Sequence, residues 1–234
     1  MHSQRFDALH PAARSIWAKS GDPQGHGLLC HMLDVAAVAD ALLEHCPVDP
    51  ARLGRWFALP ESHVRQWLAC LVGLHDLGKA IPGFQAKWEA GMQRDRNAGL
   101  SFSPDACLKL DRHDAATAKL LVPLLTGKGV QRGWASAVTQ AVSAHHGFNF
   151  LPGQASKPSS EPALWKQVRQ EIFDAYWAVL EPSCLPPDQS LSLSAVQWLA
   201  GLTSVCDWIG SNADWFAPVE RGETPGDHYA RSCE

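Results

Sequence analysis

The feature that most constrains this chain is a histidine–aspartate pair, His75-Asp76, at the end of a long apolar run. The preceding residues 67–74 contain too few polar side chains for a surface helix. Gly78 and Lys79 follow the pair, and a glycine in this place predicts a left-handed helix stop. A charged pair at the buried end of a helix is costly unless an opposite charge neutralises it. The sequence therefore predicts a divalent cation at Asp76, with its other ligands elsewhere in the chain.

The length of 234 residues, with 46% hydrophobic and 19% charged residues, indicates one substantial globular core. No apolar run reaches the roughly 18–20 residues that a membrane-spanning helix needs. The N-terminal residues lack the basic-then-apolar pattern of a secretory signal. The seven cysteines form no CxxC pair, which favours reduced thiols over a disulfide framework. We therefore expect a cytoplasmic protein without a membrane segment.

Hydrophobic periodicity near 3.6 recurs along the chain, whereas alternation with period 2 is scarce. The pattern predicts helices at about 28–44, 61–77, 84–90, 112–125, 133–146, 164–180 and 192–209. Residues 147–162 have the composition of a long surface loop. We expect an all-α helical bundle with a buried metal centre, formed by one domain over residues 1–217. Residues 218–234 are expected to be a polar, frayed tail or a linker remnant.

Other helix ends and faces also present ligand-type side chains. His31 and Asp34 lie one turn apart, His113 opens a predicted helix, and two more candidate groups lie at helix ends: His145-His146 and Asp207. Imidazole and carboxylate suit Mn, Co, Ni, Fe or Zn, and Mg where oxygens dominate. For any one histidine, a structural role in the core or on the surface is the simpler interpretation. His26 competes with His31 for the first ligand position.

The ordered pattern His31, His75-Asp76 and Asp207 resembles the HD superfamily of metal-dependent phosphohydrolases. The fuller set of segments is similar to one branch, the HD nuclease domain of the CRISPR-associated type I helicase–nuclease. The matching segments are Trp17-Ala18-Lys19-Ser20, residues 31–39, His75-Asp76-Leu77-Gly78-Lys79, Phe84-Gln85, Arg112-His113, Ala144-His145-His146-Gly147 and residues 207–212. The context His-x-x-Asp-Val-Ala favours His31 over His26 as the first ligand.

This resemblance implies a two-metal nuclease that cleaves single-stranded DNA, by endonuclease or exonuclease action, in CRISPR interference; RNA is a second candidate substrate. It implies one divalent ion on His31, His75, Asp76 and Asp207, and a second on Asp76, His113, His145 and His146. Mn, Co, Ni and Fe are the favoured metals, and Mg is an alternative. Lys79 would face the scissile phosphate, and Ser211 and Asn212 are weaker candidates for substrate contacts. A helicase domain or subunit and a CRISPR surveillance complex are the implied partners.

Two other functions compete with this interpretation. An HD phosphohydrolase acting on small nucleotides needs only one metal, so the histidines at 113, 145 and 146 would be surplus to it. A non-catalytic module that recruits a CRISPR complex or a helicase would not need intact ligands. The net charge of −4 gives no global basic field, so any attraction to nucleic acid must be local. Trp88, Phe84, Phe148 and Trp215 are candidates for base stacking, although core packing is the simpler role for them.

Overall fold

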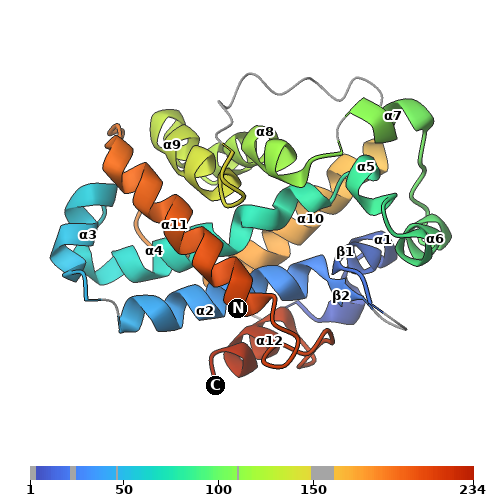
Figure 1. Cartoon of the computed structure of the whole chain (residues 1–234), viewed down its shortest axis with the longest axis horizontal. Coiled ribbons are helices and arrows are strands. Elements are labelled where there is room, and N and C mark those ends of the chain that lie inside the picture. The colour runs from blue at the N-terminus through green and yellow to red at the C-terminus, as the bar shows by residue number, and fades with distance from the viewer. Residues whose placement is uncertain (1–3, 22–24, 46, 110, 149–160) are drawn as a thin grey trace.

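The computed structural model describes residues 4–21, 25–45, 47–109, 111–148 and 161–234 (Figure 1). Within these ranges the chain is helical apart from one two-stranded sheet, so the all-α prediction is confirmed. In chain order the elements are η1 (Phe6–Ala8), α1 (Pro11–Ser15), β1 (Trp17–Lys19), β2 (His26–Gly27), α2 (Leu28–Glu44), α3 (Pro50–Phe57), α4 (Glu61–Gly73), η2 (Leu74–Lys79), α5 (Pro82–Gln85), α6 (Glu89–Asn97), α7 (Pro104–Lys109), α8 (His113–Gly127), α9 (Arg132–Ser143), α10 (Ala163–Leu180), α11 (Leu193–Gly210) and α12 (Pro225–Ser232).

Helix α2 is the centre of the bundle, and it packs against α4, α11 and α12 (Figure 1). Its sequence is rich in leucine, alanine and valine, and most of its residues are buried on all sides. Where α4 ends, Gly73 allows close approach, because a Cβ there would overlap the Tyr176 hydroxyl and the Met32 carbonyl oxygen. The Tyr176 hydroxyl donates a hydrogen bond of 2.8 Å to the carbonyl oxygen of Cys70. Helices α2, α4 and α10 are thereby locked together beside η2.

The helix predicted over residues 61–77 ends at Gly73, and residues 74–79 continue as the 3-10 helix η2. The prediction of a left-handed glycine at 78 was wrong, because positive φ angles among the described glycines occur at Gly99, Gly129 and Gly147. Gly78 serves close packing instead. A Cβ at this position would overlap the carbonyl oxygen of His113 and the backbone nitrogen of Thr117 in α8. The absence of a side chain at Gly78 therefore lets α8 lie directly on the turn that carries His75 and Asp76.

Several other segments differ from the sequence expectations. No helix was predicted between residues 44 and 61, but this stretch contains α3, which begins with an Asp49 cap and Pro50. The C-terminal tail that was expected to fray contains α12, which begins with a reciprocal capping box between Thr224 and Asp227. This helix packs on α2, so the tail folds onto the domain. Most of the predicted loop 147–162 lies outside the described residues. No helix in the described ranges is long and apolar enough to cross a membrane.

Asp95, on the inner face of α6, is a buried carboxylate whose oxygens have no hydrogen-bond donor in good geometry among the described residues. Burial raises the pKa of its carboxyl group to about 7, and the nearby Ser15 and Arg94 offset only part of this effect. The folded protein therefore binds a proton at Asp95 between about pH 4 and pH 7, where the unfolded chain has lost it. Stability contributed by this proton falls as the pH rises through that window.

We predict that Asp95→Asn makes the free energy of unfolding less dependent on pH between about pH 4 and pH 8. The wild-type protein should lose about 3–4 kcal/mol relative to the variant across this range, since one pKa unit corresponds to about 1.4 kcal/mol. Urea unfolding at a series of pH values measures both proteins. Parallel curves for wild type and variant would contradict the raised pKa.

We predict that Gly78→Ala lowers the free energy of unfolding by about 2–4 kcal/mol, because the new methyl group meets fixed backbone atoms of α8. Gly201→Ala is the matched control. A Cβ at Gly201, in the middle of α11, has no atom within 4 Å, so alanine there should stabilise the helix by about 0.5–1 kcal/mol. Thermal unfolding of both variants measures the contrast, and equal melting temperatures would refute the packing role of Gly78.

Candidate metal centre

Five separate elements bring the predicted ligands together at one end of the helical core. Helix α2 carries His31, and η2 carries His75 and Asp76. His113 is the first residue of α8, and Asp207 lies in the last turn of α11. His145 and His146 lie in the turn after α9, where Gly147 adopts a φ of 82°. All seven residues predicted as ligands thus lie in one cluster, although they come from positions 31 to 207.

Four of these residues form a buried inner group, His31, His75, Asp76 and Asp207, whose ligand atoms lie within 4.8 Å of one another. The Asp76 Oδ2 atom lies 3.1 Å from His31 Nε2 and 3.3 Å from His75 Nε2. The Asp207 Oδ1 atom lies 3.5 Å and 3.4 Å from the same two nitrogens. Two imidazoles and two carboxylates therefore surround one small volume.

The other three residues form an outer group, His113, His145 and His146, which lies nearer the surface. The Nε2 atoms of His113 and His146 are 3.0 Å apart. The second oxygen of Asp76, Oδ1, lies 3.2 Å from His113 Nε2 and 3.7 Å from His145 Nε2. Asp76 consequently directs one oxygen to each group.

The donor atoms of the centre fit divalent cations. Buried atoms without a hydrogen-bond partner in the described part of the chain include Nε2 of His31, His75 and His145 and the Oδ1 atom of Asp76. Such orphaned polar atoms are costly in a protein interior unless a cation binds them. Ligands about 2.1 Å from one ion lie about 3 Å from each other along a coordination edge, close to the spacing seen here. The set contains nitrogen and carboxylate oxygen and no thiolate, which suits Mn, Co, Ni or Fe.

Hydrogen bonds to backbone carbonyls fix the orientation of two ligand rings. The Nδ1 atom of His75 lies 3.0 Å from the carbonyl oxygen of Val72, and Nδ1 of His145 lies 2.7 Å from that of Val142. A carbonyl oxygen can only accept, so each Nδ1 carries a proton and donates. The Nε2 atoms of both rings therefore face the centre as the metal-binding atoms, as in many metal sites.

The electrostatics of the centre keep Asp76 ionised, leave the His31 and His145 rings neutral, and favour a protonated His75. Burial lowers the pKa of His31 and lowers that of His145 to about 3, so both rings are neutral at pH 7. Burial opposes the ionisation of Asp76, but the neighbouring His75 and Lys79 hold its pKa well below the usual range. Burial likewise opposes the protonation of His75, but the charge of Asp76 raises its pKa to about 9. A cation entering the inner group displaces that proton.

Two lysines reach the inner group, Lys79 from η2 and Lys19 from β1. The Lys79 ammonium is buried, lies 2.5 Å from Asp76 Oδ2 and donates a hydrogen bond of 3.1 Å to the carbonyl oxygen of Ala18. Lys79 is therefore no solvated helix-end lysine. The Lys19 ammonium, in β1, lies 3.5 Å from Asp207 Oδ1, and its side chain is 35% exposed. Lys19 lies within the matching segment Trp17-Ala18-Lys19-Ser20, but its contact with Asp207 was not predicted.

The two weaker candidates differ in their relation to the centre. The Ser211 hydroxyl donates a hydrogen bond of 2.8 Å to Asp207 Oδ1 and so lies beside the inner group. The side-chain oxygen of Asn212 accepts a bond of 2.9 Å from the backbone of Asp214, which uses it in a local turn. Thr117 was missed from the sequence: its hydroxyl donates to the carbonyl oxygen of His75 and accepts from the backbone N–H of Gly78. A threonine inside an apolar helix gives no signal of such a contact.

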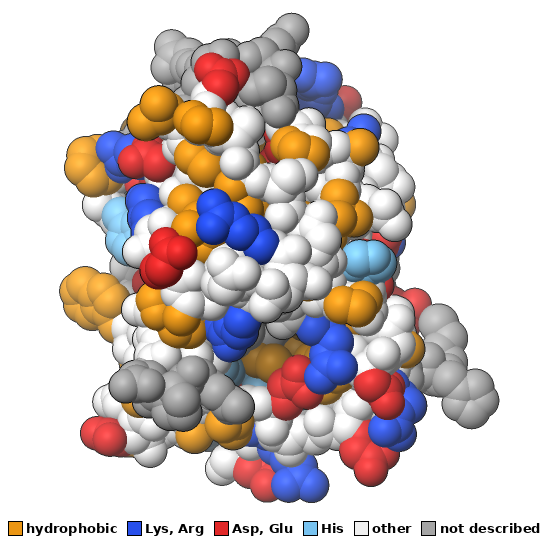
Figure 2. Space-filling view, turned by 90° about the vertical axis from the view of Figure 1, so that its right-hand side faces the viewer, with side chains coloured by type: hydrophobic (Ala, Val, Ile, Leu, Met, Phe, Trp, Pro, Cys, Tyr) orange, Lys and Arg blue, Asp and Glu red, His pale blue; other side chains and the backbone are white. Residues whose placement is uncertain are grey.

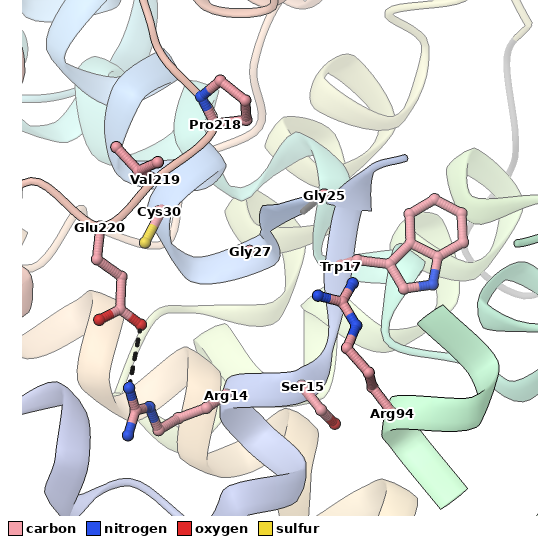
Figure 3. A pocket seen from close by; sticks show the side chains of 10 residues that line it. All are labelled: Arg14, Ser15, Trp17, Gly25, Gly27, Cys30, Arg94, Pro218, Val219 and Glu220. Atoms are coloured by element: carbon pink, nitrogen blue, oxygen red, sulfur yellow. Dashed lines mark hydrogen bonds and ion pairs between the residues drawn. The ribbon is translucent and has the colours of Figure 1, made fainter. Parts of the chain in front are cut away.

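Two residues near the first ligand lie outside the cluster. His26 and Asp34 hydrogen-bond to each other, with Nε2 2.7 Å from Oδ2, and neither belongs to the inner or outer group. Between the two competing histidines, the structure thus brings His31 to the centre. A separate hollow of about 330 Å³ lies on the other side of β2, lined by Arg14, Ser15, Trp17, Gly25, Gly27, Cys30, Arg94, Pro218, Val219 and Glu220 (Figure 3). It contains none of the seven predicted ligands.

The candidate stacking residues divide into core and surface. Phe84 is buried and Trp88 is partly buried, and both pack against Trp17. Phe148 is 54% exposed and Trp215 is 64% exposed. Trp208, which directly follows Asp207, is 74% exposed. It was not predicted as a stacking residue. Flat apolar surface is therefore available close to a ligand-bearing segment.

Comparison with known proteins gives a consistent result. Residues 17–216 match the family model described as "Cas3, HD domain". The CRISPR-associated endonuclease/helicase Cas3 of Thermus thermophilus is 39% identical over 94% of this chain, and the Escherichia coli protein of the same name is 29% identical over 80%. The match spans 24% of the length of each of these two relatives.

A solved structure of the Thermus thermophilus Cas3 HD domain in the presence of Ni²⁺ is 34% identical, with a TM-score of 0.68. The match covers 95% of this chain and 86% of that one. A second structure, of a CRISPR-associated protein, is 28% identical with a TM-score of 0.77 over 94% of this chain and 26% of that one. Because the family model covers most of the chain and a relative exceeds 30% identity, the chain belongs to the Cas3 HD domain family.

Proposed function

We propose that this chain is a metal-dependent nuclease domain that hydrolyses phosphodiester bonds of single-stranded DNA with two divalent cations. The observation that carries the proposal is Asp76, whose two carboxylate oxygens face two separate groups of ligands. The names of the Thermus and Escherichia relatives include an endonuclease, and the Thermus HD domain structure was obtained with Ni²⁺, which supports a metal-dependent reaction. Mn, Co, Ni or Fe would suit this donor set, and Mg would bind more weakly to its imidazole nitrogens.

His31, His75, Asp76 and Asp207 would hold one cation, and Asp76 with His113, His145 and His146 would hold the second. When bound, two such cations supply water activation and neutralise the leaving oxygen of an in-line displacement. Lys79 adds a buried positive charge at Asp76, suited to a non-bridging phosphate oxygen. Ser211 orients Asp207 through its hydrogen bond. The carbonyl oxygens of Val72 and Val142 keep two rings in the orientation that the reaction requires.

A single strand suits this centre better than a duplex does. The inner group is almost entirely buried, and access is from the side of His113 and His146, so a flexible strand can bring one phosphate to it. The face in Figure 2 has basic side chains interleaved with acidic and hydrophobic ones rather than a broad basic field. Local contacts must then supply the affinity. Trp208, Trp215 and Phe148 offer exposed rings on which bases can stack.

Two competing functions are weaker. A phosphohydrolase acting on small nucleotides with one metal leaves the outer group of three histidines without a role. A module that only recruits a CRISPR complex does not need the orphaned ligand atoms. We propose a helicase domain or subunit and a CRISPR surveillance complex as partners, and residues 1–217 as the nuclease unit with α12 packed against it.

We predict that Asp76→Ala lowers Mn²⁺-dependent cleavage of a labelled single-stranded oligonucleotide by about a thousandfold or more, because one carboxylate serves both cation positions. Helicity measured by circular dichroism should be retained. A parallel assay with nucleoside monophosphates and triphosphates separates the nuclease from the small-nucleotide enzyme. Cleavage by Asp76→Ala at the wild-type rate would refute the proposed function.

We predict that His146→Ala and His145→Ala each lower the bound metal from about two ions to one per chain, since both remove a ligand of the outer group. His63→Ala is a matched control, because this surface histidine contacts only the neighbouring Ser62 hydroxyl in the recorded hydrogen bonds. Equilibrium dialysis against Mn²⁺ followed by elemental analysis measures the stoichiometry. One ion in both wild type and variants would leave the chain with a one-metal mechanism.

A further inference from the structure

A second buried polar cluster is centred on Asp34, one helical turn along α2 from the candidate ligand His31, and no step of the proposed reaction uses it. Asp34, fully buried, accepts three hydrogen bonds: from His26 Nε2 at 2.7 Å, His228 Nε2 at 3.0 Å and the Ser232 hydroxyl at 2.6 Å. Because β2 carries His26, α2 carries Asp34 and α12 carries the other two, this Asp34 cluster ties three segments together.

The protonation pattern of the cluster shows that it is built around an ionised carboxylate. Nδ1 of His228 accepts a hydrogen bond of 3.0 Å from the backbone N–H of Arg221, so its Nε2 carries the proton that Asp34 accepts. Three donors compensate the cost of burying the charge, which is large for an unpaired carboxylate. The Asp34 carboxylate therefore has hydrogen-bond donors from the protein itself.

The hairpin that carries His26 is too short to hold its own position. The ladder pairs Trp17 with Gly27 and Lys19 with His26, with an irregular register between them. The Trp17 end is fixed by Gln85, which accepts from the Trp17 N–H at 3.2 Å and donates to its carbonyl oxygen at 2.8 Å. β2 borders the hollow in Figure 3 through Gly27, and Gly25, just before the strand, packs against the Trp88 ring. The hydrogen bond between His26 and Asp34 ties the Lys19 end of the hairpin to α2.

Strand β1 in turn delivers two contacts to the metal centre. Lys19 places its ammonium 3.5 Å from Asp207, and the carbonyl oxygen of Ala18 accepts a hydrogen bond from Lys79. A shift of the His26 end of the hairpin moves Lys19 directly, because Lys19 and His26 are cross-strand partners. A change of about 1 Å at a reacting centre is enough to slow catalysis substantially.

We propose that Asp34 is a positioning residue that, through His26, fixes Lys19 beside Asp207, and that α12 completes this support by supplying two of the three donors. The role of Lys19 in cleavage rests on the proposed nuclease function. The position of the hairpin does not, so the two can fail separately.

Asp34→Asn tests the proposal with little change of shape, because an amide cannot accept all three hydrogen bonds. We expect kcat on a single-stranded oligonucleotide to fall about tenfold with unchanged Mn²⁺ content. In a Lys19→Met background the same change should lower kcat less than about twofold, since the residue through which it acts is already gone. Additive effects in this double-mutant cycle, or loss of metal in proportion to activity, would overturn the proposal.

Asp40→Asn is the matched control on the same helix. Asp40 accepts two hydrogen bonds of 2.7 Å from Arg65 and has no recorded contact with the hairpin. It should lower stability and leave both kcat and metal content at wild-type values. If Asp34→Asn does not fold, His26→Phe and His26→Gln replace it: phenylalanine removes the donor to Asp34, and glutamine restores one.

Hydrogen exchange of the metal-free protein gives a readout that does not depend on activity. In Asp34→Asn the amides of residues 17–19 and 26–28 should exchange at least about tenfold faster, while Asp40→Asn leaves them unchanged. Unchanged exchange at the hairpin would overturn the positioning role even in an active enzyme. Faster exchange in a protein whose wild type cleaves no single-stranded DNA would refute the nuclease and leave the structural role of Asp34 in place.

Discussion

The structure depends on the burial of two carboxylates, Asp76 and Asp207, among imidazoles in a helical core. Ionised carboxylates are unfavourable in such surroundings unless positive charge accompanies them. Each element around the centre supplies part of that compensation: α2 and η2 bring His31 and His75, and two lysines approach from β1 and η2. Two bound divalent cations would supply the rest of the positive charge that stabilises the two buried carboxylates. The helical core thus holds two carboxylates close together and away from solvent.

Close backbone packing fixes the relative positions of the segments that carry the candidate ligands. Gly78 lets α8 lie on η2, the turn that carries His75 and Asp76. The Thr117 hydroxyl donates one hydrogen bond to this turn and accepts another from it. The distance between Asp76 and His113 is consequently set by backbone contact rather than by flexible side chains. Backbone contact of this kind explains how residues from distant segments can keep ligand atoms within a few ångströms of each other.

The sequence allowed the helices and the set of candidate ligands to be predicted, but not the roles of several neighbours. Periodicity located α2 at residues 28–44, and the helix predicted over 192–209 corresponds to α11, which Ser192 caps in the structure. Helical spacing placed Asp34 one turn from His31, but its carboxylate accepts hydrogen bonds from His26, His228 and Ser232 and does not join the inner group. Lys19 belongs to a strand of three residues, too short for its pairing to appear as a pattern. Gly78 was predicted to be a left-handed helix stop, because the sequence gives no sign that α8 packs against it.

The support of Asp34 by α12 shows that the folded unit reaches past the family match. The family match stops at residue 216, whereas two of the three donors to this buried carboxylate come from His228 and Ser232. A shorter version of the domain cut at the edge of the match would leave a charge in the core with one remaining partner. A version of the domain that keeps these donors must therefore include α12.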